Sequence, residues 1–180
     1  NFTMTGGQFA MGNNTGAPVI NLAGNFNLNG GSFLMRSEAG TAGGTFTINA
    51  SNGVFVASGA TLTRATTKTG TCNFNFAKAG TQVYTNAGTV SENIGWTVNS
   101  GATVDLGTNI ISGSGTFSVS SGGGLRIGST SGITSSGATG NIQVTGTRTF
   151  STGGNYEYNG AAAQAAGNGL PATVNNLTVN

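Results

Sequence analysis

A short phrase that recurs along the chain limits its possible folds more than any other feature. The clearest copy is Trp96–Gly107, in which two alternating runs, Trp96/Val98 and Val104/Leu106, are separated by residues 100–102. Period-2 alternation places the large apolar side chains on one buried face and the polar residues on the other. The separating Ser-Gly-Ala is too short for a helix and suits a tight corner. The phrase therefore predicts two short β-strands joined by a corner.

Similar strand pairs follow one another along the whole sequence. Their leading residues include Phe26, Phe46, Phe74, Trp96 and Phe117, at spacings of about 20–28 residues. This spacing matches one coil of a parallel β-solenoid, in which each coil lays its strands on the coil below at about 4.8 Å. We therefore predict an all-β fold, a parallel β-solenoid (β-helix) of about eight coils. An antiparallel sandwich, which also has short strands at regular spacing, is the competing architecture.

A larger repeat of about 70–82 residues is superimposed on these coils. Its matching pairs are Phe26/Leu28 with Trp96/Val98, Phe46/Ile48 with Phe117/Val119, Val54/Val56 with Leu125/Ile127, Phe74/Phe76 with Tyr156/Tyr158, and Trp96/Val98 with Leu177/Val179. The offset changes along the chain, which predicts about eleven inserted residues between Ile133 and Tyr156. We interpret residues 1–180 as one solenoid segment with an internal repeat over about 26–99 and 96–180.

The composition favours an ordered β-protein with many corners. The 180 residues include 33 Gly, and only 6% are charged, against roughly 7% Gly and 25% charged residues in typical globular proteins. Gly and Asn accept the positive φ angles of corners, and Thr, Ser and Asn stack where identical charges would repel. The six Lys and Arg residues are scattered, so we expect no nucleic-acid partner. No apolar run approaches about 18 residues, so we expect no membrane insertion.

Several phrases carry a resemblance to a known group of proteins. They are Gly44-Thr-Phe-Thr-Ile-Asn and the stretches 96–107, 115–125 and 156–180. These phrases resemble the β-strand-repeat surface proteins, which are very large bacterial proteins often exported by type IX secretion. The resemblance implies a secreted, adhesin-like protein at the bacterial cell surface, with repeats continuing on both sides. The chain starts in mid-pattern without an initiator Met or a signal peptide, so we expect it to be a segment of a longer or processed protein.

Few residues in the sequence are suited to catalysis or metal binding. There is no His, and the four acids, which share no local motif, are Glu38, Glu92, Asp105 and Glu157. Calcium-binding solenoids use repeated Asp, and this chain has only one. Cys72 is the single cysteine and is expected to be a small buried residue. We therefore predict no catalytic, cofactor or metal site. A polysaccharide-cleaving β-helix enzyme, in which neighbouring coils bring two distant acids together, is an alternative.

Binding of a glycan and binding of ice are two further alternatives. Tyr84 is the candidate residue for a glycan contact, because the repeat pattern places Trp96, Tyr156 and Tyr158 at inward positions. A flat array of Thr-x-Thr, such as Thr45/Thr47, could order water at an ice surface. The positions that the pattern equates with it are Asn25/Asn27, Asn73/Asn75, Gly95/Thr97, Thr116/Ser118 and Asn155/Glu157. The predicted array is therefore not sustained.

The leading hypothesis is a non-enzymatic stalk or spacer in a large secreted protein. Its end strands would leave unpaired edges, which natural proteins normally cover. We expect flanking repeats of the same protein, or a capping or secretion partner, to cover Phe2 and Leu177. Gln82 and Gln164 both follow corners that contain Gly, and we interpret them as a structural pair that satisfies backbone groups.

Overall fold

The computed structural model describes residues 1–12, 17–36, 45–65 and 70–180. Within these ranges every helix or strand element is a β-strand, and the pairings between strands are parallel. The prediction of an all-β chain with parallel pairing is confirmed, and the antiparallel sandwich is wrong. The Ala-rich run 161–166 forms no helix, as its short length predicts.

The strands form two sheets. The ten-stranded sheet contains β1 (Phe2–Ala10), β3 (Phe26–Leu34), β5 (Val54–Val56), β6 (Thr61–Thr63), β8 (Gly80–Asn86), β9 (Thr89–Val90), β11 (Ala102–Asp105), β13 (Gly124–Ile127), β15 (Asn155–Tyr158) and β16 (Asn176–Val179). The six-stranded sheet contains β2 (Val19–Leu22), β4 (Thr45–Ala50), β7 (Thr71–Phe76), β10 (Gly95–Val98), β12 (Phe117–Val119) and β14 (Arg148–Phe150).

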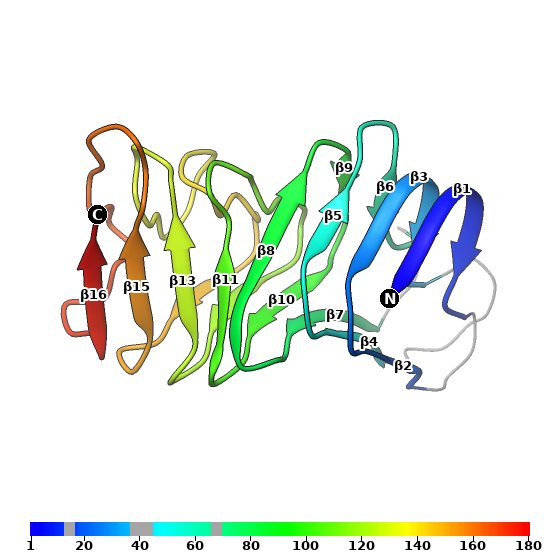
Figure 1. Ribbon diagram of the computed structural model, residues 1–180, viewed down its shortest axis with the longest axis horizontal. Coiled ribbons are helices and arrows are strands. Elements are labelled where there is room, and N and C mark those ends of the chain that lie inside the picture. Colours follow the sequence, from blue (N-terminus) through cyan, green and yellow to red (C-terminus); the bar gives the residue numbers. More distant parts are fainter. Residues whose placement is uncertain (13–16, 37–44, 66–69) are drawn as a thin grey trace.

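The order of the strands in each sheet follows the order of the chain, with one branch. The larger sheet runs β16-β15-β13-β11-β8-β5-β3, where β3 also pairs with β1 and with the branch β6-β9, and the smaller runs β14-β12-β10-β7-β4-β2. Figure 1 shows the larger sheet extending along the long axis of the molecule, with the N-terminus near one end and the C-terminus at the other.

Apolar side chains stack in register between the two sheets. In the six-stranded sheet, Trp96 pairs with Phe74 on one side and Phe117 on the other, and all three are fully buried. The rings of Phe74 and Trp96 stack with their centroids 4.9 Å apart. Phe46, which the solenoid prediction also requires to be inward, is fully buried. Each buried aromatic or branched aliphatic side chain stabilises the fold by about 1.5–3 kcal/mol, so these columns supply most of the driving force.

The first turns of the chain differ from the expected pattern. The alternation in residues 1–12 predicts two brief strands and a corner, whereas β1 is one strand with register shifts near its middle. The Gly-Gly pairs of β1 and β3 lie over each other in close contact. A Cβ on Gly31 would stand only 2.3 Å from the carbonyl oxygen of Gly7, so no larger residue fits there. The strand therefore bends without ending, and β3 pairs with β5 through its first half and with β6 through its second.

The larger sequence repeat corresponds only in part to equivalent places in the sheets. Phe46 and Phe117 both lie in the six-stranded sheet, and Val54 and Leu125 both lie in the ten-stranded sheet, as the repeat predicts. The other three matches join strands of different sheets: β3 with β10, β7 with β15, and β10 with β16. These three sequence matches therefore join places that are not equivalent in the sheets. Any inward strand of either sheet needs the same alternation, so similar phrases occur at places that are not equivalent.

The insertion that the repeat predicts is present in one turn. Phe117 follows its sheet neighbour Trp96 by 21 residues, but Arg148 follows Phe117 by 31. Likewise, Tyr156 follows Leu125 by 31 residues. The added residues lie between β13 and β14 and include the segment 134–144, which is folded around the side chain of Arg148.

Candidate functional site

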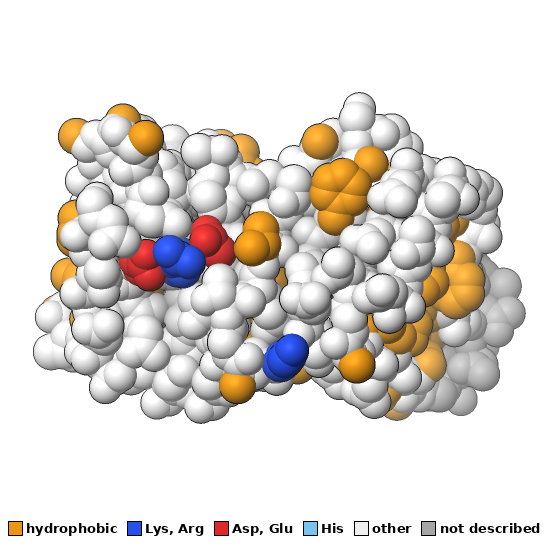
Figure 2. Space-filling model, viewed as in Figure 1, with side chains coloured by type: hydrophobic (Ala, Val, Ile, Leu, Met, Phe, Trp, Pro, Cys, Tyr) orange, Lys and Arg blue, Asp and Glu red, His pale blue; other side chains and the backbone are white. Residues whose placement is uncertain are grey.

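The charged side chains that the structure brings together lie on three neighbouring strands of the larger sheet. Asp105, Arg126 and Glu157 occupy the same register position on β11, β13 and β15 and point outward. Nη1 of Arg126 lies 3.2 Å from Oδ2 of Asp105, and its Nη2 donates a 2.8 Å hydrogen bond to Oε1 of Glu157. Figure 2 shows this charge ladder as a red, blue and red group on the face of the sheet.

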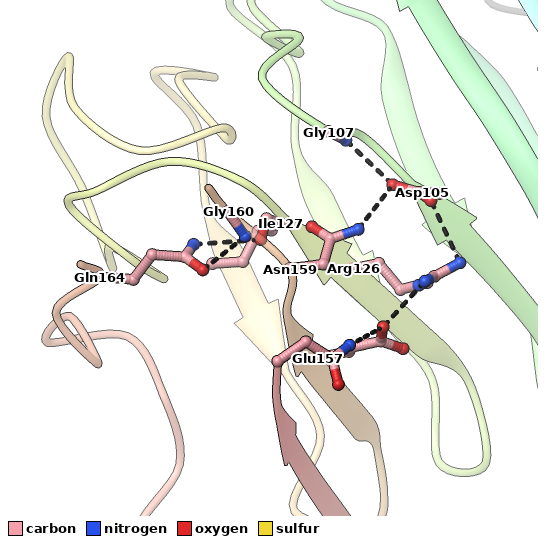
Figure 3. A network of polar contacts seen from close by, with 9 residues as sticks. Asp105, Gly107, Arg126, Ile127, Glu157, Asn159, Gly160 and Gln164 are labelled. Atoms are coloured by element: carbon pink, nitrogen blue, oxygen red, sulfur yellow. Dashed lines mark hydrogen bonds and ion pairs between the residues drawn. The ribbon is translucent and has the colours of Figure 1, made fainter. Parts of the chain in front are cut away.

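Neighbouring polar groups hold the ladder in place. Oδ1 of Asp105 accepts hydrogen bonds from the backbone N–H of Gly107 and from the side chain of Asn159. Oε1 of Glu157 also accepts a hydrogen bond from Asn180. These contacts join residues of β11, β13 and β15, and residues that follow them, to the residue that follows β16. Figure 3 shows how Asp105, Arg126 and Glu157 lie. The hydrogen bond to Glu157, together with the two negative charges, raises the pKa of the Arg126 guanidinium despite partial desolvation.

The geometry of the charge ladder favours a structural role over acid–base chemistry. The structure does bring two acids that lie far apart in sequence to one face, as the enzyme alternative requires. A guanidinium stands between them, however, so each carboxylate already has a cationic partner. Opposite charges at stacked positions stabilise strand pairing, and a partly exposed ion pair contributes about 0–1 kcal/mol.

A shallow hollow lies next to the charge ladder. It is lined by polar outward side chains, including Thr103, Asn155 and Asn176, around Gly124 on the central strand. A Cβ at Gly124 would stand 2.3 Å from the hydroxyl oxygen of Thr103, so the Thr103 side chain already lies over this glycine. The hollow is thus a small notch with hydrogen-bonding groups on its walls.

The candidate glycan contact at Tyr84 is corrected by the structure. Tyr84 lies on β8 with its side chain inward and no exposed area, packed edge-on against Phe76 and Trp96. Its ring therefore presents no face to a sugar, and burial raises the pKa of its phenol well above the usual value. Sequence reasoning left the direction of Tyr84 open because Gln82 and Tyr84 share one face of β8, which the apolar pattern alone does not identify.

The other aromatic expectations are confirmed, and one aromatic residue was missed. Trp96, Tyr156 and Tyr158 are buried, as the repeat predicts. Phe55 is 39% exposed on the outward face of β5. Its signal in the sequence is its place between the inward residues Val54 and Val56, which sets its side chain on the opposite face.

The two glutamines have different surroundings. Gln164 satisfies a corner as predicted. Its Nε2 donates to the carbonyl of Ile127, and its Oε1 accepts from the N–H of Gly160 (Figure 3). Its Nε2 also donates to the carbonyl of Ser129. Gln82 lies within β8, where it pairs with Val104, and donates to the carbonyl of Lys78. The backbone-satisfying role holds for both, but the two positions are not equivalent.

The outward face of the six-stranded sheet carries a ladder of small polar side chains. The sequence pattern equates Thr45/Thr47 with Asn73/Asn75, and this is wrong by two residues. In the sheet Thr47 pairs with Asn73, and Asn49 pairs with Asn75. Strands β3 and β15, which carry the other predicted equivalents Asn27 and Asn155/Glu157, belong to the larger sheet. One ladder contains, in register, Asn21, Asn49, Asn75, Thr97, Ser118 and Thr149.

Hydrogen bonds link neighbours along this polar ladder. Asn49 donates to Asn21 at 2.7 Å and Asn75 donates to Asn49 at 2.9 Å. Ser118 donates to Thr97 at 3.2 Å. The neighbouring outward positions of the central strands, Asn73, Gly95 and Thr116, differ in shape from one strand to the next. The side chains thus satisfy one another, but the face is not a uniform threonine array.

Cys72 lies at a buried position beside Phe46, as expected for a small core residue. Burial raises the pKa of its thiol, although the nearby guanidinium groups of Arg64 and Arg36 oppose this shift. In the part of the chain that the structure describes, no three potential metal ligands of the His, Cys, Asp or Glu type gather together. The same ranges hold no helix of the length and apolarity needed to cross a membrane.

Comparison of the chain with protein-family models, with curated proteins and with solved structures found no match.

Proposed function

We propose that the chain is a parallel β-solenoid segment of about eight coils that serves as a stalk or spacer and has no enzymatic activity. The observation that carries this proposal is the run of eight strands, β1-β3-β5-β8-β11-β13-β15-β16, that pair in parallel from one end of the molecule to the other. Inward apolar side chains continue across these pairings, for example Val104, Leu125 and Tyr156. A continuous core of this kind resists bending, because bending would open contacts between successive coils.

The surface of the molecule fits this structural role. Figure 2 shows few charged side chains on the visible face, and the charge ladder joins successive strands rather than surrounding a free carboxylate. The two ends of the chain lie at opposite ends of the long axis (Figure 1), as a spacer that separates two attached parts requires. The wider proposal is a secreted, adhesin-like protein at the bacterial cell surface, exported by the type IX route. That part rests on the resemblance of the repeat phrases.

A distance measurement tests the spacer directly. Nitroxide labels on Cys residues introduced as Thr3→Cys and Thr178→Cys would mark β1 and β16, while the buried Cys72 stays unlabelled. Seven parallel strand spacings predict a single narrow distance of roughly 35 Å. A broad distribution, or one that changes with mild warming, would contradict a rigid spacer.

The alternatives give different outcomes in binding and turnover assays. A glycan array that shows specific binding would favour a carbohydrate-binding module, and loss of binding on Phe55→Ala or Asn155→Ala would locate it on the face of the larger sheet. Product release from acidic polysaccharides would favour a β-helix enzyme, and thermal hysteresis in freezing solutions would favour ice binding. The spacer proposal predicts none of the three activities.

A further inference from the structure

The sequence contains four Asn-Gly dipeptides, at residues 29–30, 52–53, 159–160 and 168–169. Asparagine is a thermally labile residue. In an Asn-Gly pair the backbone nitrogen of the glycine can attack the side-chain carbonyl carbon of the asparagine, because glycine has no side chain to obstruct a close approach. The rate of this reaction in a folded chain depends on how firmly the glycine N–H and the asparagine amide are held.

The pair Asn159–Gly160 is held at both of its reacting groups. The N–H of Gly160 donates a 2.7 Å hydrogen bond to Oε1 of Gln164, and the side-chain amide of Asn159 donates to Oδ1 of Asp105 at 3.4 Å (Figure 3). Attack of the nitrogen on the asparagine side chain would break both contacts. The fold therefore slows the reaction at this pair.

The pair Asn168–Gly169 is held in a similar way. The N–H of Gly169 donates a 2.8 Å hydrogen bond to the carbonyl of Ile133, and Oδ1 of Asn168 accepts a 2.9 Å hydrogen bond from the N–H of Ser135. The fourth pair, at residues 29–30, lies inside β3, which pairs with β1. An extended strand backbone has to leave its sheet before it can close a five-membered ring, so this pair is restrained as well.

The pair Asn52–Gly53 differs from the other three. It lies in the corner between β4 and β5, and Asn52 is exposed. Within the described ranges its side chain makes no hydrogen bond. The N–H of Gly53 donates to Oδ1 of Asn25, which immediately precedes β3, at 3.2 Å. This contact is longer than those of the glycine nitrogens at 160 and 169. The restraint on this pair is therefore a long hydrogen bond to one side chain.

We propose that Asn52 is the site at which this chain deamidates and that the side chain of Asn25 sets the rate. The backbone nitrogen of Gly53 forms a bond to Cγ of Asn52 and gives up its proton, and the bond from Cγ to the side-chain nitrogen breaks. Ammonia leaves and a succinimide ring remains. Water then opens the ring on either side, which yields aspartate or isoaspartate at position 52.

The modification changes the corner between the two sheets. Both products add a negative charge to an exposed position. Isoaspartate also lengthens the backbone by one carbon atom, because the chain then passes through the former side chain. The corner joins the buried residues Ala50 and Val54, and Val54 pairs with Phe26. The isoaspartate form should therefore unfold at a lower urea concentration than the aspartate form.

Incubation of the full chain in mildly alkaline buffer, followed by peptide mapping with mass spectrometry, tests the proposal. Asn52 should convert several-fold faster than Asn159 or Asn168, and the product should include isoaspartate. Faster conversion of either of those two residues would overturn the proposal.

Two substitutions of Asn25 test its role. Asn25→Ala removes the acceptor for the N–H of Gly53 and should speed conversion of Asn52 several-fold. Asn25→Asp keeps an oxygen acceptor at the same place and should not speed it. Equal acceleration in both variants, or acceleration at all four Asn-Gly pairs in Asn25→Ala, would show that this hydrogen bond does not set the rate.

Gly53→Ala and Gln164→Leu are the matched controls. A Cβ at Gly53 would stand 3.4 Å from the carbonyl oxygen of Val83, an ordinary contact, and Gly53 has no positive φ, so the alanine fits the fold. It should nearly stop conversion of Asn52. Gln164→Leu should speed conversion at Asn159 and leave Asn52 unchanged. The inference depends on the geometry of one corner, so its failure would leave the spacer proposal intact.

Discussion

Arg148 lies directly beside Phe117 in the parallel register of the six-stranded sheet, at a position that Phe74 and Trp96 fill on earlier strands. An arginine therefore replaces an aromatic side chain at the end of a core column. Its guanidinium donates to the carbonyls of Thr134, Gly137 and Val144. Desolvation lowers the pKa of this guanidinium. The inserted segment 134–144 thus folds around a buried cation that its own backbone satisfies.

The first prediction concerns that cation. Arg148→Met should lower the free energy of unfolding by about 2–4 kcal/mol, because the buried carbonyls lose their donors at roughly 1–3 kcal/mol for each unsatisfied group. Urea denaturation measures the loss, and hydrogen exchange should quicken first within 134–144. Arg126→Met is the control, with a loss below about 1 kcal/mol because that side chain is 30% exposed. Equal losses in the two variants would mean that the insertion does not depend on Arg148.

The second prediction compares two phenylalanines on neighbouring turns. Phe46 is fully buried, whereas Phe55 is 39% exposed. Phe46→Ala should cost about 3–5 kcal/mol, since it removes a whole ring from the core and leaves a cavity. Phe55→Ala should cost less than about 1 kcal/mol, the range of most surface substitutions. Thermal and urea unfolding of both variants check the direction in which each side chain points. A larger loss for Phe55→Ala would contradict the register of β4 and β5.

The third prediction separates backbone strain from close packing. Gly31 and Gly59 have nearly the same positive φ, +76° and +79°. A Cβ at Gly59 meets nothing within 4 Å, whereas at Gly31 it lies 2.3 Å from the carbonyl oxygen of Gly7. Gly59→Ala should therefore cost about 1–2 kcal/mol from conformation alone. Gly31→Ala should cost clearly more, and calorimetric unfolding of the pair measures the difference. Equal costs would show that the two Gly-Gly segments separate without penalty.

The fourth prediction is a loss of stability at alkaline pH. Burial raises the pKa of Tyr156 to about 12, and its hydroxyl donates a 2.7 Å hydrogen bond to the carbonyl of Ser151. The phenol has a pKa near 10 in an unfolded chain. Its neutral form is therefore favoured in the fold, so its contribution is complete below about pH 10 and declines as the pH rises toward 12. Burial raises the pKa of Tyr84 and Tyr158 as well, which gives the same sign.

Ultraviolet titration of phenolate and urea denaturation between pH 8 and about pH 11 measure this effect. In Tyr156→Phe the free energy of unfolding should fall less steeply as the pH rises. Both proteins contain the buried Cys72 thiol, so its contribution cancels in the comparison. Tyrosines that ionise near pH 10 in the folded chain, with stability independent of pH, would contradict the buried positions.

Alternation alone was sufficient to predict the class of fold and much of the core. It correctly placed Phe46, Trp96, Phe117 and Tyr156 inward, because an inward position on a short strand demands a large apolar residue. The same rule does not tell the two sheets apart. Trp96/Val98 and Leu177/Val179 have the same pattern but lie in different sheets, since both sheets impose the same demand.

The charge ladder shows what alternation could not supply. Asp105 and Glu157 carry no shared motif, and Arg126 lies between them only because turns of 21 and 31 residues bring β11, β13 and β15 into register. The outward direction of each residue was predictable from its strand. The identity of its neighbours on adjacent strands was not, because it depends on the length of every intervening turn.

The sequence by itself determined that this protein is built of short β-strands with one apolar face, since period-2 alternation and glycine corners leave few other ways to bury the large side chains. Only the tertiary structure decided which strands adjoin. Pairing is set by how each turn closes, and the sheet assignment of Trp96, the burial of Tyr84 and the replacement of an aromatic residue by Arg148 all follow from that closure.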